Sequence, residues 1–176
     1  MVTRQGPKPV ATVIGIDPGL GGAIAILDRA TSHVYVLCRM PTIGTGHAGK
    51  KRLLDLPAVL AAFATAPGAP VFLEKVNASP QMGVVSAFKF GRTLGALEAA
   101  ATACGHAVTL VPPAVWHRDV CAGAEGADAK HRALVSVRRL FPNQTCIPPG
   151  CTVPHDGLVD ALLIAEYGRR RLLGRL

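Results

Sequence analysis

The stretch that most constrains the fold is IGIDPGLGG, residues 14–22, which places a carboxylate at the end of an apolar strand. A second apolar run, AIAIL, begins at residue 23. Side chains alternate between the two faces of a strand, so Asp17 shares its face with Val13 and Gly15. The glycines that follow would let a ligand's backbone come close to Asp17, although Asp-Pro-Gly taken alone is more typical of a simple hairpin turn.

The order of apolar strands and amphipathic helices predicts an α/β fold built on one mixed sheet. Short turns separate three expected strands, at residues 10–16, 23–27 and 34–40, which makes them antiparallel neighbours. The run VFLEKV at residues 71–76 is apolar on both faces, so we expect a central strand parallel to the first. A fifth strand at residues 106–112 completes a five-stranded mixed sheet whose first three strands are antiparallel.

Helical spacing of apolar residues predicts four helices, which flank the sheet on both faces. They are expected at residues 53–66, 84–103, 129–140 and 156–172. Two segments that contain glycine and basic residues, 41–52 and 112–130, are expected to be irregular connections.

A single domain accounts for a chain of 176 residues. We expect it to span residues 10–172, between a flexible basic tail at 1–9 and a basic C-terminal end at 173–176. The stretch GRRRLLGRL, residues 168–176, is expected to be solvated or to add a nonspecific DNA contact. No stretch approaches the roughly 20 apolar residues of a membrane span, and no apolar signal core follows the N-terminus, so we expect no membrane association and a cytoplasmic location.

The charge balance favours a polyanionic partner. Lys and Arg number 19 against 11 Asp and Glu, a formal net charge of +8. Nucleic acid fits this excess before a membrane surface does, and solubility alone is the plain alternative. The five scattered cysteines fit reduced thiols better than disulfides. Cys146, Cys151 and His155 would begin a zinc site, but a second close Cys/His pair is missing.

Two further segments place carboxylates beside apolar surfaces. Glu74 lies at the end of its strand, and an unpaired buried carboxylate normally finds a metal or a partner. A Glu74–Lys75 pair at a strand edge is the structural alternative. Asp156 and Asp160 are four residues apart, so they lie on one face of the final helix. Asp156 alone would fit a helix start, where the dipole favours anions.

Three segments thus deliver carboxylate oxygens to what we expect to be one site. Hard oxygen ligands with few histidines suit Mg²⁺ or Mn²⁺ better than zinc. Two such ions about 4 Å apart can activate a water and stabilise the leaving oxygen of a phosphodiester. A basic chain with a centre of this kind indicates a nuclease.

In the order and spacing of its motifs the chain resembles the RuvC-like Holliday junction resolvases of the ribonuclease H-like fold, particularly the short phage-type members. The resemblance covers residues 10–170. It rests on IGIDPGLGGAIAIL, VFLEKV, SAFKFGRTLGALEAA, VPPAVWHRDV with Lys130 downstream, and HDGLVDALLIAEYG. It implies an endonuclease that acts as a homodimer on four-way or other branched DNA, with two Mg²⁺ ions per site, for which Mn²⁺ substitutes, and no nucleotide cofactor.

The resemblance also implies roles for the acidic residues. Asp17 matches the first-strand carboxylate, Glu74 the fourth-strand one and Asp160 the last acid. The remaining ligand of the family often lies three residues before that last acid, where this chain has glycine. Asp156 is therefore our choice for the fourth ligand, and His155 is the runner-up.

Basic residues that flank this centre are expected to bind DNA phosphates without reading sequence. They are Lys75, Lys89, Arg92, His117, Arg118, Lys130 and Arg132. Lys130 resembles a catalytic-site lysine of the family that reaches the cleaved phosphate, and a solvated helix start is its alternative role. The VW motif is commonly followed by lysine, whereas this chain has His117, which would contact phosphate only when protonated.

Two more features of the family bear on the substrate and on assembly. In the cellular resolvases an aromatic residue shortly after the fourth-strand glutamate wedges into the junction, and KVNASPQM contains none. The helix at residues 84–103 would pack against its twin in the dimer, with another of its faces against the sheet.

Other functions fit parts of the same pattern. A sugar-kinase or actin-like ATPase also has Asp-x-Gly after its first strand, but it needs two related domains to clamp a nucleotide, and this chain has room for one. A noncatalytic DNA-binding relative would have no need to keep acids at three places. Among nucleases, a debranching enzyme for forks, flaps or D-loops is the serious rival, and processing of ribosomal RNA precursors is a weaker one.

Overall fold

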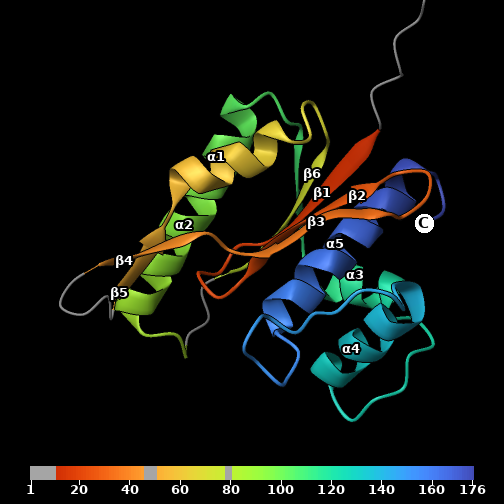
Figure 1. Cartoon of the computed structure of the whole chain (residues 1–176). Coiled ribbons are helices and arrows are strands. Elements are labelled where there is room, and N and C mark those ends of the chain that lie inside the picture. Colours follow the sequence, from red (N-terminus) through yellow and green to blue (C-terminus); the bar gives the residue numbers. More distant parts are fainter. Residues whose placement is uncertain (1–10, 46–50, 78–80) are drawn as a thin grey trace, which may run out of the picture.

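The computed structural model describes residues 11–45, 51–77 and 81–176. Its main sheet has five strands in the order β3-β2-β1-β6-β7 (Figure 1). These are β1 (Thr12–Asp17), β2 (Ala23–Asp28), β3 (Val34–Arg39), β6 (Val71–Glu74) and β7 (Val108–Val111). The first three strands are antiparallel, β6 runs parallel to β1, and β7 runs parallel to β6. The predicted five-stranded mixed sheet is confirmed.

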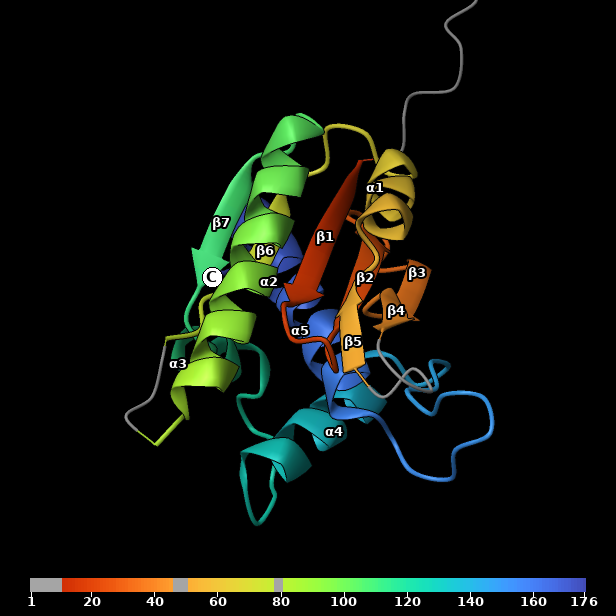
Figure 2. The ribbon, with the colours of Figure 1, turned by 90° about the vertical axis from the view of Figure 1, so that its left-hand side faces the viewer.

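Helices cover both faces of this sheet (Figure 2). α1 (Leu56–Ala64) and α2 (Val84–Ala103) lie on one face, and α3 (Pro113–Val120), α4 (Ala129–Leu140) and α5 (Asp156–Leu172) lie on the other. The predicted bounds of α2, α4 and α5 are confirmed.

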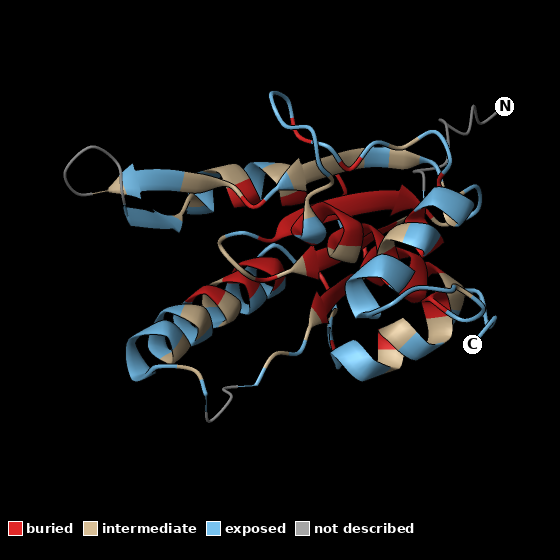
Figure 3. Cartoon of the chain, turned by 90° about the horizontal axis from the view of Figure 1, so that it is seen from below, coloured by how far each residue is buried: buried red, intermediate tan, exposed pale blue. Residues whose placement is uncertain are grey.

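Alternation of side chains along the strands divides the core in two. Ile14 and Ile16 of β1 pack with Phe63 of α1 and Leu97 of α2. Val13, whose side chain faces the opposite side of β1, belongs to the second cluster, around α3, α4 and α5. Figure 3 shows that the buried residues concentrate in the strands of the main sheet and in α5. Alternate side chains of β1 therefore pack against the two different layers of helices.

The helix α5 lies directly against β1 because Gly15 has no side chain. A Cβ at Gly15 would lie 2.2 Å from the backbone nitrogen of Ala165 and 2.4 Å from the carbonyl oxygen of Ala161. Gly168 makes room in the same way for Phe72 of β6, whose ring would lie 2.3 Å from an added Cβ. This close packing carries the first turns of α5 to the end of β1, where the chain places its first carboxylate.

Residues 41–52, predicted to be an irregular loop, instead contain two strands. β4 (Thr42–Thr45) and β5 (Lys51–Leu54) pair antiparallel and form a separate two-stranded sheet. Residues 46–50, which connect them, lie outside the described residues. Most side chains of both strands are exposed or only half-buried, so no apolar alternation marks them in the sequence.

Two helix predictions also need correction. α1 begins at Leu56 and not at residue 53, because Asp55 caps it by accepting a hydrogen bond from the backbone N–H of Ala58 at 3.2 Å. The segment at residues 112–130 contains α3, in which Pro113 takes the first helical position, where its missing N–H costs no hydrogen bond. The expected tail at residues 1–9 lies outside the described residues. Within the described ranges, no helix has the length and apolar character needed to cross a membrane.

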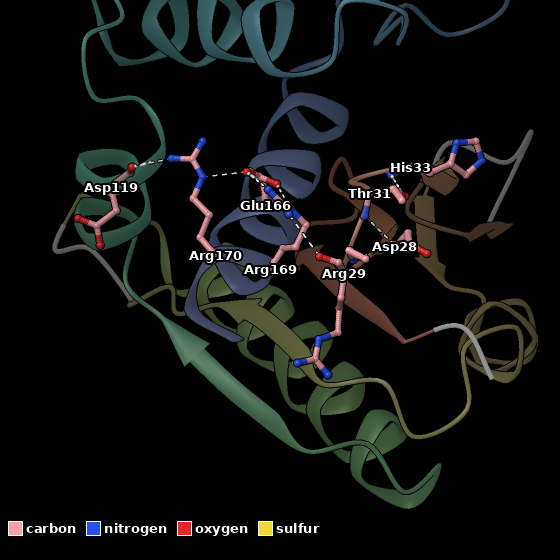
Figure 4. A network of polar contacts seen from close by, with 9 residues as sticks. Asp28, Arg29, Thr31, His33, Asp119, Glu166, Arg169 and Arg170 are labelled. Carbon is pink, nitrogen blue, oxygen red and sulfur yellow. Dashed lines mark hydrogen bonds and ion pairs between the residues drawn. The ribbon is translucent and has the colours of Figure 1, made fainter. Parts of the chain in front are cut away.

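Buried ion pairs hold the last third of α5. Glu166 is 2% exposed and accepts hydrogen bonds from Nε of Arg169 at 2.6 Å and from Nε of Arg170 at 2.8 Å (Figure 4). Arg169 also donates to the carbonyl oxygen of Arg29 at 3.3 Å, and Arg170 donates to that of Asp119 at 3.2 Å. The expectation of a solvated stretch at residues 168–176 is therefore wrong for these two arginines, which tie α5 to the β2–β3 turn and to α3.

Replacing Glu166 by glutamine is expected to lower the free energy of unfolding by about 3 kcal/mol, because the charge of Arg169 would stay buried without its partner. Urea denaturation measures the change. Glu125→Gln removes the same charge from an exposed position and should change the free energy of unfolding by less than about 0.5 kcal/mol. Equal losses in the two variants would contradict the role of the buried pair.

Candidate metal and nucleic-acid site

The parallel pairing of β1 with β6 brings two carboxylates to the same edge of the sheet. Ile16 lies opposite Leu73 in this register, and each strand then ends with its acid, Asp17 in β1 and Glu74 in β6. Alternation of side chains turns both acids towards the face that α5 covers. The structure therefore brings together two of the residues predicted to form the site.

The first turns of α5 bring Asp160 to the same edge. Gly157, one turn before it, packs against the turn after β1, since a Cβ at Gly157 would lie 2.6 Å from the carbonyl oxygen of Gly21. A Cβ at Gly22 would lie 2.1 Å from the carbonyl oxygen of Asp17. Gly22 therefore makes room for protein packing and not for a ligand, whereas the Cβ position of Gly21 opens onto empty space.

Burial and mutual repulsion act on the three carboxyl groups. The pKa of Asp160 is raised from 3.8 to about 7, first by burial and then by the charges of Asp17, Glu74 and Asp156. Burial raises the pKa of Glu74 from 4.5 to about 7, with a hydrogen bond from Trp116 acting in the opposite direction and the charge of Asp17 adding to the rise. Burial also raises the pKa of Asp17. Carboxyl groups from three distant segments are thus close enough for their charges to interact, as is typical of functional sites.

His155 and Asp156 border this centre in different ways. His155 is the N-cap residue of α5, and its Nδ1 is buried with no hydrogen-bond partner in the part of the chain that the structure describes. When protonated, the ring lowers the pKa of Asp17. The side chain of Asp156 is 61% exposed and accepts a hydrogen bond from Nζ of Lys130 at 2.6 Å. A buried ring nitrogen is therefore available at His155, while the carboxylate of Asp156 is already paired.

Lys130 lies at the start of α4, across a small hollow from the acids. The hollow measures about 140 Å³, and its lining includes Lys130, Asp156 and Asp160. Both partners of the Lys130–Asp156 pair are exposed, so the pair contributes little energy. Lys130 can therefore exchange this carboxylate for another anion, such as a phosphate.

Trp116 of α3 is a residue of the site that the sequence did not single out for this role. Its fully buried indole donates a hydrogen bond from Nε1 to Oε1 of Glu74 at 3.0 Å. His117 stacks on the indole with ring centroids 3.8 Å apart, and burial lowers the pKa of His117. A neutral imidazole is a poor phosphate ligand, so the predicted DNA contact of His117 would still require a protonated ring.

The remaining predicted DNA-binding residues lie in separate places. Lys75 is exposed just after β6, Arg132 is exposed on α4, and Arg118 pairs with Asp119 at 2.6 Å. Lys89 and Arg92, on α2, line a groove that they share with the β4–β5 hairpin. These cations therefore come from four elements of the fold: the end of β6, α2, α3 and α4.

The donor set fits a hard divalent cation. Asp17, Glu74 and Asp160 offer carboxylate oxygens, which Mg²⁺ and Mn²⁺ prefer. Across residues 11–45, 51–77 and 81–176, no three His, Cys, Asp or Glu side chains are grouped closely enough to form a ready-made metal site. Cation binding would thus require the carboxylates to approach one another. Cys146, Cys151 and His155 likewise form no ready-made zinc site among the described residues; Cys146 is buried and Cys151 is exposed.

Comparison of the sequence with protein-family models and with curated proteins finds no match. Solved structures do match. A structure of T. thermophilus RuvC in complex with a Holliday junction substrate is similar, with a TM-score of 0.61 and 20% identity over 94% of this chain and 97% of that chain. A second Thermus thermophilus RuvC structure has a TM-score of 0.53 and 22% identity over 93% and 97% of the two chains. The chain therefore has the ribonuclease H-like fold of RuvC.

The raised pKa values of Asp160 and Glu74 predict how stability depends on pH when a chelator removes divalent cations. Between about pH 4 and pH 7 the folded chain binds protons more tightly than the unfolded chain, so these groups lower stability as the pH rises through that range. Asp160→Asn is expected to raise the Tm at pH 8 by roughly 5 °C, since 1 kcal/mol corresponds to about 2–4 °C in a chain of this size. Thermal melts from pH 5 to pH 8 measure the effect.

Asp119→Asn is the matched control for this prediction. The hydrogen bond from Arg118 lowers the pKa of Asp119, so this group contributes stability that is present above its ordinary pKa. Its replacement should not raise the Tm at pH 8. An Asp160→Asn variant that loses stability between pH 5 and pH 8 as steeply as the wild type would contradict the prediction.

Proposed function

We propose that this protein is a divalent-metal-dependent, structure-selective endonuclease that cuts four-way junctions and related branched DNA. One observation carries the proposal: half-buried carboxyl groups at the ends of β1 and β6 and in α5 meet at one sheet edge, where the charge of Asp17 raises the pKa of both Glu74 and Asp160. Holding several buried acids together without cationic partners is costly, and divalent cations offset that cost. The net charge of +8 supports a polyanionic substrate.

In this proposal each residue of the site has a defined task. Asp17, Glu74 and Asp160 hold two Mg²⁺ ions, and Trp116 orients Glu74 through its indole N–H. Bound Mg²⁺ supplies water activation and stabilisation of the leaving oxygen in phosphodiester hydrolysis. Lys130 exchanges its exposed carboxylate partner for a phosphate oxygen of the substrate.

Support for a branched substrate comes from the fold, which this chain shares with a RuvC that was solved with a Holliday junction. Fold alone does not fix the substrate. The absence of an aromatic residue in the KVNASPQM segment favours a broader enzyme that also cuts forks, flaps or D-loops. We retain this broader specificity as the second candidate function.

An uncovered apolar face of α2 supports a homodimer. Val84, Val85 and Phe88 are 85%, 68% and 72% exposed. The Cβ positions of Gly91 and Gly95, on the same helix, open onto empty space. Exposed apolar surface of this kind marks interaction sites, and the small residues allow a second helix to come close. A twin α2 is the partner that we propose, because two sites in one particle would allow symmetrical cutting of two strands.

Asp17→Asn and Glu74→Gln are each expected to lower the cleavage rate of a labelled four-way junction in Mg²⁺ by more than about 100-fold, because each removes a carboxylate that would bind the cation. Binding of the junction should remain within about threefold, because positively charged side chains provide most of the affinity. Gel assays measure cutting and binding on the same substrate. Glu125→Gln, an exposed carboxylate-to-amide change, should leave both unchanged.

A substrate panel of junction, fork, flap and duplex DNA separates the alternatives. Faster cutting of forks and flaps than of junctions would select the broader enzyme. Binding without any cutting by the wild type would indicate a noncatalytic relative, and near wild-type cutting by either variant would show that the site is assigned wrongly.

The fourth ligand can be identified by comparing two neighbouring residues. His155→Ala is expected to lower cleavage by about 100-fold, because His155 has a buried ring nitrogen without a partner, whereas Asp156→Asn should lower it by only about tenfold, because Asp156 pairs with Lys130. Titration with Mg²⁺ gives a second readout, in which His155→Ala should need more Mg²⁺ for half-maximal activity. A larger loss in Asp156→Asn on both measures would assign the ligand to Asp156 instead.

A further inference from the structure

A groove lies between the β4–β5 hairpin and α2, next to the carboxylate centre. It measures about 570 Å³. Lys51 and Arg52 of β5 contribute to one wall, and Lys89 and Arg92 of α2 contribute to the other. The lining also includes Leu20, Leu53, Leu54 and Leu56. The groove therefore combines basic and apolar side chains.

The charge in this groove is entirely positive. No Asp or Glu is among its lining residues, and none of its four cations forms an ion pair within the described ranges. All four side chains are exposed. Cations of one sign that line a cleft with apolar walls concentrate the electric field and attract a polyanion. Four cations on two elements also exceed the charge that a single phosphate ion would neutralise.

The groove reaches the turn that follows Asp17. Leu20, three residues after Asp17 in the turn between β1 and β2, is part of its lining. The hairpin and the N-terminal half of α2 both extend past the main sheet on this side (Figure 3). A strand that leaves the carboxylate edge in this direction would pass between them.

We infer that the groove holds the phosphate backbone of one strand of the nucleic-acid substrate, between Lys51 and Arg52 of the hairpin and Lys89 and Arg92 of α2. This inference rests on the proposed function. It adds two phosphate-binding residues from the hairpin, a segment to which neither the motifs nor the carboxylate centre assigns a role. Contacts of this kind fix the position of a strand and are independent of its sequence.

The test measures the affinity of the full chain for a fluorescent four-way junction, with EDTA present, over a series of salt concentrations. Lys51→Gln/Arg52→Gln is expected to weaken binding about tenfold and to lower the slope of log K against log salt by about 1.4 to 1.8, since each lost phosphate contact removes about 0.7 for a single strand or 0.9 for a duplex. The control, Arg138→Gln/Arg139→Gln, removes the same charge from two exposed positions in the last turn of α4. It should change the slope by less than about 0.5.

A second variant separates lost charge from a disturbed hairpin. Lys51→Arg/Arg52→Lys keeps both charges and should bind as the wild type does. If the neutral hairpin variant keeps the wild-type affinity and slope, or loses no more than the control, the groove does not bind the substrate, while the proposed function stands. If the wild type binds no branched DNA at all, the proposed function fails and this inference fails with it.

Discussion

The contact on which the rest of the structure depends is the direct packing of α5 on β1 at Gly15. The backbone of Ala161 and Ala165 occupies the space that a side chain at this position would need. Because β1 and α5 touch without a layer of side chains between them, Asp160 of α5 lies close to the end of β1. The acidic edge is thus a consequence of backbone packing at a glycine, and any side chain there would push the helix and its carboxylate away.

The carboxylates at the two ends of α5 have opposite electrostatic surroundings. Near its C-terminal end, Glu166 is buried but has two arginine partners, so its charge is neutralised and the helix is anchored. Near its N-terminal end, Asp160 is half-buried beside other acids, whose charges raise its pKa, and the opposing effect of Lys130 is smaller than theirs. The charge of Glu166 is neutralised, whereas that of Asp160 is repelled by neighbouring carboxylates. The repulsion at Asp160 lowers the stability of the folded chain. Such local sacrifices are characteristic of functional sites.

Apolar patterning made the main sheet predictable, because β1, β2 and β6 are buried and their apolar runs show it. The same runs located the acids that end two of these strands. The β4–β5 hairpin was missed because its strands are largely exposed and carry no alternation. α3 was missed because its proline-containing start resembles a loop. The hydrogen bond from Trp116 to Glu74 joins residues 42 positions apart, so no local spacing could reveal it.

The glycine at position 157 shows how packing at one point restricts the chemistry at another. The RuvC-like resolvases, which this chain resembles, often have a metal ligand at this position. In this chain a Cβ at position 157 would lie 2.6 Å from the carbonyl oxygen of Gly21 and 2.7 Å from Cα of Gly22. The turn after β1 therefore lies too close to α5 for any side chain to fit without a shift of the backbone. The same close packing holds Asp17 beside the start of α5, where the charge of a protonated His155 lowers the pKa of Asp17. In the proposed nuclease a fourth donor would then come from the residues just before position 157, where the buried Nδ1 of His155 has no hydrogen-bond partner within the described chain.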